Sequence, residues 1–247
     1  MTNKRTRAIV AYDGTDYQGF QRQANGPTVQ GALEKALAQI TQSSIRVLAA
    51  GRTDTGVHAE GQVIAFDTAW PHSRSDLMRA LNAVLPPDIA IRDLEQAESD
   101  FHPRYDAISR RYCYTVYNAA LRSPLVRRVS LHVAGALDLE AMEAATAAIV
   151  GEHDFAAFGR PTQGTVTVRR VIKACWAAGA PWLFFEIEAN AFLFRMVRSI
   201  VGTLLWVGQG KLSPADFAAV LASRDRSQAG QTAPAHGLCL MEVKYEE

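Results

Sequence analysis

Residues 50–59 concentrate groups that could do chemistry in one short polar segment. The segment reads AGRTDTGVHA and holds an Arg, an Asp, two Thr, a His and two Gly. A turn between two strands needs at most one or two Gly or polar residues. Asp54 could therefore be a nucleophile, a general base or a turn former. Arg52 precedes it by two residues, so both side chains project to the same side of an extended segment, and the cation keeps Asp54 ionised. We expect Asp54 to be catalytic.

The apolar stretch 192–202 is the second unusual feature. It predicts a long helix over about 191–207, with Arg195, Arg198, Ser199 and Gly202 on one face. A cation on so apolar a helix needs a partner, because a buried unpaired charge is very costly. Two interpretations stay open: a solvated edge of the helix, or an Arg198 that points into a cleft and meets Asp54.

The segment 108–114, ISRRYCY, places two Arg before alternating Tyr. This pattern suits phosphate contact combined with base stacking. An ordinary half-buried strand with a polar start fits it equally well. The polar segment 12–23, rich in amides and aromatic rings, is predicted to be a binding loop. The chain has no Walker loop and no dinucleotide fingerprint.

The composition is that of an ordinary globular protein. The chain has 247 residues, 48% of them hydrophobic and 21% charged, with a net charge of +1. Its three Cys and six His show no metal-ligand or redox spacing. No apolar run reaches the roughly 18 residues of a membrane span, and none suits a signal peptide. We expect a cytoplasmic protein that does not enter the membrane.

The hydrophobic pattern predicts an α+β fold in two halves, 1–106 and 107–247. The first half reads strand, helix, strand, strand, helix, strand, which is the ferredoxin-like order with an antiparallel sheet. Its expected elements are strands at 8–12, 45–49, 62–66 and 89–91, and helices that begin after the caps Thr28 and Ser73. The second half repeats the theme, with strands at 112–117, 182–188 and 238–243. Its helices include the long helix and two that follow the caps Asp138 and Ser213.

Several segments together resemble the tRNA pseudouridine synthase A family. The resemblance covers nearly the whole chain. Its motifs are 51–59, 12–15 with 19–23, 111–114, 190–192 with 196–202, and 232–238. The chain departs from the family's usual residues at Phe20, Gly159 and Cys239.

The resemblance implies a role for each matched residue. Asp54 is the implied nucleophile, Arg52 the Arg that moves with base flipping, and Arg198 the partner of the catalytic carboxylate. Tyr112 is implied to contact the uracil and Leu238 to line its pocket. Three basic residues are predicted to contact RNA: Arg22 in the first loop, and Arg110 and Arg111 in the segment 108–114.

The resemblance also implies a fold and a reaction. The fold is the pseudouridine synthase fold, with two ferredoxin-like halves around a positively lined cleft. The enzyme is an isomerase, an intramolecular transferase that converts uridine to pseudouridine at positions 38, 39 and 40 in the anticodon arm of tRNA. The reaction needs no metal or organic cofactor, and the protein is implied to be a homodimer.

Two other functions remain open on the residues alone. One is a non-catalytic RNA-binding protein that acts as an RNA chaperone, in which Asp54 is a structural turn residue. The other is a phosphoryl-transfer enzyme, which would depend on a divalent metal.

Overall fold

The computed structural model describes residues 4–246 and divides into two compact units. The first unit comprises Met1–Ile108 and Leu240–Glu247, and the second comprises Ser109–Cys239. The predicted halves, 1–106 and 107–247, instead place the whole C-terminal segment in the second half. The last strand, β10 (Leu238–Tyr245), begins in the second unit and ends in the first. There it runs beside β3, so closely that a Cβ on Gly61 would meet the Met241 carbonyl oxygen.

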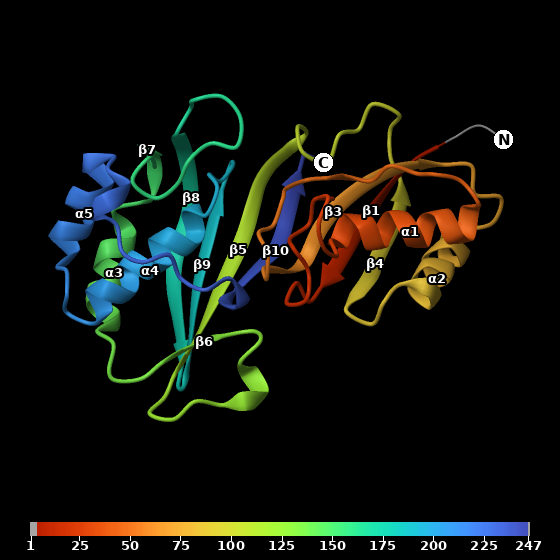
Figure 1. Cartoon of the computed structure of the whole chain (residues 1–247). Coiled ribbons are helices and arrows are strands. Elements are labelled where there is room, and N and C mark those ends of the chain that lie inside the picture. The colour runs from red at the N-terminus through yellow and green to blue at the C-terminus, as the bar shows by residue number, and fades with distance from the viewer. Residues whose placement is uncertain (1–3, 247) are drawn as a thin grey trace. The chain divides into compact units, whose positions relative to one another are not determined.

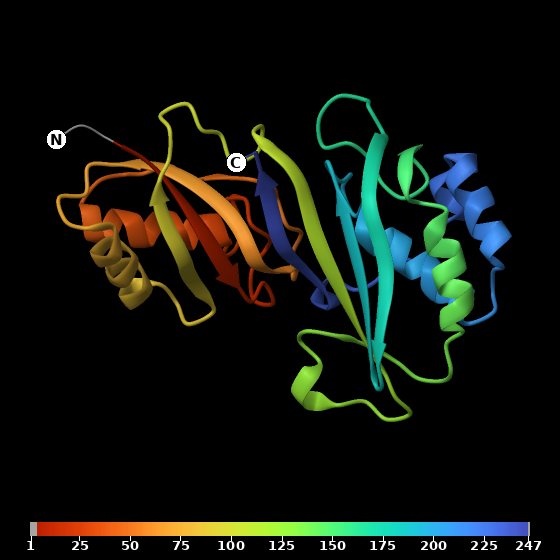
Figure 2. The same cartoon turned by 180° about the vertical axis from the view of Figure 1, so that it is seen from behind.

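The first unit has the predicted strand and helix order (Figures 1 and 2). Its elements are β1 (Lys4–Tyr12), α1 (Val29–Thr41), β2 (Leu48–Ala49), β3 (His58–Thr68), α2 (Arg74–Val84) and β4 (Ile89–Gln96). Strand β1 pairs antiparallel with β3 and β4, and β2 pairs antiparallel with residues 64–65 of β3. Helix α1 lies in front of these strands in Figure 1 and behind them in Figure 2.

The helix caps form where the sequence predicts them. The Thr28 hydroxyl accepts from the Gly31 amide, and the Ser73 hydroxyl accepts from the Asp76 amide. Strand β2 is shorter than the expected 45–49. Side chains of α1 bond both backbone groups of Val47: Glu34 Oε1 accepts from its amide at 3.1 Å, and Gln30 Nε2 donates to its carbonyl at 3.1 Å. A residue bonded in this way has no groups left for a strand ladder.

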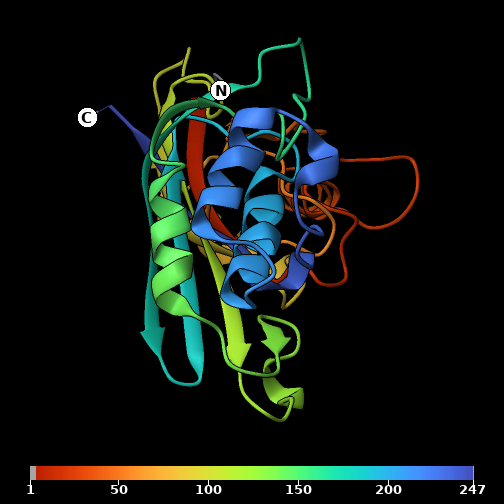
Figure 3. The ribbon, with the colours of Figure 1, turned by 90° about the vertical axis from the view of Figure 1, so that its left-hand side faces the viewer.

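The second unit also combines an antiparallel sheet with helices. Its strands are β5 (Ala107–Asn118, whose first two residues belong to the first unit), β6 (Leu131–Val133), β7 (Gly151–Asp154), β8 (Val168–Gly179) and β9 (Trp182–Ala189). The main sheet order is β5-β9-β8-β7, and the short β6 pairs parallel with β5. Helices α3 (Leu139–Ala147), α4 (Met196–Gly208) and α5 (Pro214–Ser223) contact one another (Figure 3). The α+β class with antiparallel sheets is thus confirmed.

The long helix α4 begins later than predicted. It starts at Met196 rather than near 191, so Arg195 does not share a helical face with Arg198, and that prediction was wrong. The Arg195 backbone is left-handed (φ 62°), and the Phe194 amide donates to the Arg160 carbonyl at 2.9 Å. The Asn190 Oδ1 accepts from the Ala191 amide at 2.8 Å. These bonds hold 190–194 in a non-helical form that apolar periodicity cannot reveal.

Helix α4 is the central helix of the second unit, and only Arg198 and Trp206 of its residues are not buried. Its Gly202 lies against the segment 230–233, where a Cβ would fall 1.8 Å from the Gln231 carbonyl oxygen. The Thr203 hydroxyl accepts from the Gly230 amide at 2.9 Å. The absence of a side chain at Gly202 therefore sets how closely this segment approaches the helix.

We expect Gly202→Ala to destabilise the protein by about 1–3 kcal/mol, because the added methyl group would push the backbone of 230–233 away. Chemical denaturation measures this difference. Gly179→Ala is the matched control, because a Cβ there meets nothing within 4 Å. Equal stabilities for the two variants would contradict the close packing.

Candidate active site

The loop that carries Asp54 is anchored through Thr53. The Thr53 side chain is buried, and its Oγ1 lies 2.7 Å from the hydroxyl oxygen of Tyr12, the last residue of β1. The fully buried Gln62, on β3, donates from Nε2 to the Gly51 carbonyl at 2.9 Å. These bonds tie the loop to two neighbouring strands of the first unit, so its backbone is positioned before any substrate binds.

The first loop, residues 13–20, packs directly on the Asp54 loop. A Cβ on Gly14 would lie 2.0 Å from the Val57 carbonyl oxygen, and one on Gly19 would lie 2.7 Å from the Thr53 carbonyl oxygen. Gly19 also has a positive φ of 82°. The Phe20 amide donates to the Thr53 carbonyl at 3.1 Å. The two loops therefore touch backbone to backbone, a contact that glycine alone permits.

Asp54 begins a tight turn. The Val57 amide donates to the Asp54 carbonyl at 3.1 Å, and Gly56 has the positive φ (76°) that a type II turn requires at its third position. Arg52 is exposed, Thr53 is buried and Asp54 is half-buried. The turn thus holds the Asp54 carboxylate at the boundary between the packed loop backbone and solvent.

His58 supports the same loop from the start of β3. Its side chain is buried, and its Nδ1 lies 3.1 Å from the Gly14 amide nitrogen and 3.0 Å from Asp13 Oδ1. The amide requires an unprotonated Nδ1, whereas the carboxylate would require a protonated one. Asp13 Oδ1 already accepts from both the amide and the hydroxyl of Thr15, so the amide contact is the better satisfied. His58 therefore helps to join the first loop to the Asp54 loop.

Tyr112 and Tyr114 lie on β5 in the second unit. The Tyr112 ring is half-buried and meets Phe192 edge to face, with ring centroids 5.1 Å apart. Tyr114 is fully buried, and its hydroxyl donates to the Pro234 carbonyl at 2.9 Å. Burial raises the pKa of Tyr114, so its phenol stays neutral. Of the two rings, only that of Tyr112 is accessible enough to meet a base.

Arg198 is bonded to the segment that leads into Leu238. Its Nε donates to the Ala233 carbonyl at 2.7 Å, while the Ala233 amide donates to the Arg198 carbonyl at 3.0 Å. Leu238 itself is buried. A Cβ on Gly237 would lie 2.6 Å from the Tyr114 ring. The second unit therefore connects Arg198, Leu238 and the tyrosine strand through segment 233–238.

The three predicted phosphate contacts have different surroundings. Arg22 is exposed, with an ion pair to Glu34 at 3.5 Å. Arg110 donates to the Asn190 carbonyl at 2.9 Å. Arg111 lies 3.8 Å from Glu186. Because side chains alternate along a strand, Arg110 shares the face of Tyr112 and Arg111 projects to the other.

The predicted site residues thus form two groups. Arg22, Arg52 and Asp54 belong to the first unit, and the remaining predicted residues to the second: Arg110, Arg111, Tyr112, Arg198 and Leu238. The pairing of Asp54 with Arg198 joins different units and stays a prediction. The supporting roles of Tyr12, Gln62 and Gly19 were not predicted from the sequence. Gly19 had a detectable signal, since it lies in the polar segment 12–23 and glycine marks turns and loops.

Residues 4–246 contain no group of three or more His, Cys, Asp or Glu that could hold a metal ion. No helix in that range is long and apolar enough to cross a membrane.

Comparisons with known proteins agree on one family. The family model described as tRNA pseudouridine synthase matches residues 8–106 and 145–246. The tRNA pseudouridine synthase A of Geotalea uraniireducens (strain Rf4) is 46% identical over 243 residues, covering 98% of this chain and 100% of that one. That of Chloroflexus aurantiacus (strain ATCC 29366 / DSM 635 / J-10-fl) is 48% identical over 242 residues, covering 96% and 87%.

The likeness to solved structures is weak. A chain of the crystal structure of a Cbf5-Nop10-Gar1 complex aligns with a TM-score of 0.40 and 12% identity, covering 97% of this chain and 50% of that one. The sequence relationships are much stronger, because they span nearly whole chains at high identity. The chain belongs to the tRNA pseudouridine synthase family and is an isomerase that forms pseudouridine in tRNA.

Proposed function

We propose that Asp54 is the nucleophile of this pseudouridine synthase. The observation that supports this role is the loop around it: a half-buried carboxylate on a turn whose backbone is held by Tyr12, Gly19 and Gln62. A turn residue with only a structural role would not need such support. A nucleophile does, because a small misplacement of the attacking oxygen costs much of the rate.

The reaction needs only one nucleophile and proton transfers. The bond between uracil N1 and ribose C1′ breaks, the base turns, and a bond forms between C5 and C1′. N1 gains a proton and C5 loses one, so atoms balance and nothing is oxidised. The Asp54 carboxylate could attack C1′ or uracil C6. Both routes require the uridine to leave its stack.

The other site residues bind and orient the uridine in this proposal. Tyr112 contacts the uracil, Leu238 forms an apolar wall, and Arg198 pairs with the Asp54 carboxylate. Arg52 moves with base flipping. Phosphates are contacted by Arg22, Arg110 and Arg111, the last of these from the strand face opposite Tyr112.

We propose that the modified uridines are at positions 38, 39 and 40 of the anticodon arm. The support is the motif resemblance together with relatives named tRNA pseudouridine synthase A. The same resemblance supports a homodimer that acts in the cytoplasm without metal. Light scattering tests the oligomeric state, and a mass equal to one chain would remove the dimer.

We expect Asp54→Asn to lower pseudouridine formation by at least about 10³-fold, because the amide is a poor nucleophile. Carbodiimide treatment and primer extension on an unmodified tRNA transcript, in the presence of a chelator, measure the product and map its position. Wild type should give stops in the anticodon arm.

Retained tRNA binding by Asp54→Asn is the control that separates chemistry from folding. Turnover by this variant at the wild-type rate would remove Asp54 as nucleophile. Stops outside the anticodon arm would overturn the proposed positions, and loss of wild-type activity in chelator would indicate a metal requirement.

Arg198→Ala should reduce kcat strongly, by about 10²-fold or more, because the Asp54 carboxylate would lose its cationic partner. The thermal midpoint should change little, since the side chain is only half-buried and water can replace its bond to the Ala233 carbonyl. Steady-state kinetics and thermal unfolding measure both effects. Full activity in this variant would refute the pairing with Asp54.

Arg22→Ala and Arg110→Ala should each weaken tRNA binding and reduce the salt slope of log K by about 1, because each removes one phosphate contact. Binding titrations over a range of salt concentrations measure the slope. Arg79→Ala, an exposed cation on α2, is the matched control. A slope equal to that of the control would exclude the residue as a phosphate contact.

A further inference from the structure

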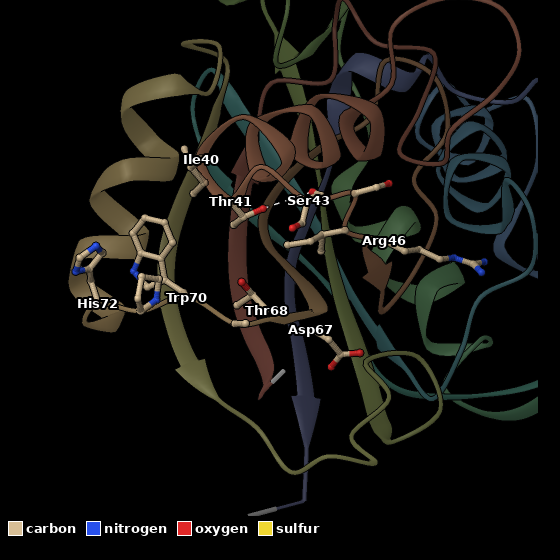
Figure 4. A pocket seen from close by; sticks show the side chains of 12 residues that line it. Ile40, Thr41, Ser43, Arg46, Asp67, Thr68, Trp70 and His72 are labelled. Carbon is tan, nitrogen blue, oxygen red and sulfur yellow. Dashed lines mark hydrogen bonds between the residues drawn. The ribbon is translucent and has the colours of Figure 1, made fainter. Parts of the chain in front are cut away.

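A hollow of about 570 Å³ lies in the first unit, at the end of β3 farthest from the Asp54 loop. We call it the β3-end pocket; its walls are the end of α1, segment 43–46, the end of β3 and segment 69–72 (Figure 4). Its volume is in the range of sites that bind small organic groups. The pocket plays no part in the proposed chemistry of Asp54.

One wall of the β3-end pocket is aromatic. Trp70 is half-buried, and its indole N–H donates to the Ser73 carbonyl at 3.2 Å, which fixes the ring. His72 meets it edge to face, with centroids 5.4 Å apart. Both rings lie on the same side of the hollow in Figure 4. A fixed, half-exposed indole can serve as a platform on which a planar base stacks.

The floor of the pocket carries an unused polar group. Thr68 is only 6% exposed, and among residues 4–246 its buried hydroxyl has no hydrogen-bond partner. In Figure 4 this hydroxyl turns toward the hollow. A buried polar group without a partner destabilises the fold, and a ligand in the hollow would relieve that cost once the Thr68 side chain rotates to expose its hydroxyl.

The remaining groups complete a site for a nucleotide. Ser43 and Arg46 are exposed on the rim. Asp67, also on the rim, is bonded to Arg5 at 2.6 Å, so its charge is already compensated. The pocket therefore offers hydroxyls for a base or ribose and a guanidinium for a phosphate, beside the aromatic wall.

The pocket is far from Asp54. The eleven residues of β3 separate the two, and at about 3.3 Å per residue they span roughly 33 Å. One uridine cannot reach both places. An RNA that places a uridine at Asp54 can reach the pocket only with another nucleotide.

We propose that the β3-end pocket docks an unstacked nucleotide of the tRNA, remote from the modified uridine, with its base on Trp70 and a hydrogen bond to Thr68. The proposal rests on tRNA being the substrate. It does not depend on which residue is the nucleophile.

Equilibrium binding of labelled full-length tRNA tests the proposal. Trp70→Ala should raise Kd roughly 5- to 150-fold, the usual effect of removing one stacking ring, whereas Trp70→Phe should stay near wild type. Thr68→Val should raise Kd roughly 2- to 10-fold without lowering the thermal midpoint, because it removes a hydroxyl that has no partner within the fold. The value of kcat at saturating tRNA should not change in any of these variants.

Two controls and one test with a free nucleotide define the ligand. Trp182→Ala removes a half-buried indole from the second unit and should leave Kd for tRNA within about twofold. An RNA hairpin that carries only the modified segment should bind wild type and Trp70→Ala alike, because it lacks the remote nucleotide. Adenosine 5′-monophosphate tests a site for free nucleotides through the quenching of tryptophan fluorescence that wild type shows and Trp70→Ala lacks.

Unchanged tRNA affinity in both Trp70→Ala and Thr68→Val would overturn the proposal. Trp70-dependent binding of adenosine 5′-monophosphate together with unchanged tRNA affinity would also overturn it and assign the pocket to a free nucleotide. Because binding is measured at equilibrium, either failure is distinguishable from failure of the role proposed for Asp54.

Discussion

The direct backbone contact between loop 13–20 and the Asp54 loop is the constraint on which the position of Asp54 in the first unit depends. Gly14 and Gly19 bring the two loops closer than any side chain would allow. The Tyr12 and Gln62 side chains then bond the Asp54 loop from two strands. With its backbone held from several directions, the turn fixes the point from which the Asp54 side chain projects. Preorganisation of this kind would lower the reorganisation needed in the proposed attack by Asp54.

The second unit uses the same physical means for a different purpose. Gly202 lets segment 230–233 lie against helix α4, and the bonds between Arg198 and Ala233 hold that segment to the helix. Gly237 lies directly against the Tyr114 ring, where a Cβ would have no room. In both units a glycine contact sets the distance between two backbones, and a side-chain bond fixes their orientation. Each half of the proposed site therefore depends on residues that never touch the substrate.

Local sequence patterns correctly predicted the helix starts that depend on hydrogen bonds between residues close in the chain. The caps Thr28, Ser73 and Ser213 begin helices because their hydroxyls bond amides within the next turn. The predicted start of α4 was wrong because two hydrogen bonds keep the preceding residues out of the helix. The Asn190 side chain accepts one, and the carbonyl of Arg160, which is distant in sequence, accepts the other. Strand β8 was missed because its exposed side chains mix charged and apolar residues, so no clean alternation marks it. Strand β2 is shorter than predicted because side chains of α1 bond both backbone groups of Val47.

The residue types and their order were enough to identify the family and to single out Asp54, because this carboxylate, the proposed nucleophile, lies with a neighbouring cation and flanking glycines in one short segment. The supports of that segment come from β1, the first loop and β3, and only folding brings them together. Folding also decided that, among the described residues, the Thr68 hydroxyl is buried without a partner in the pocket that Trp70 lines. Contacts between residues far apart in the chain leave no periodic pattern, so they are determined by packing.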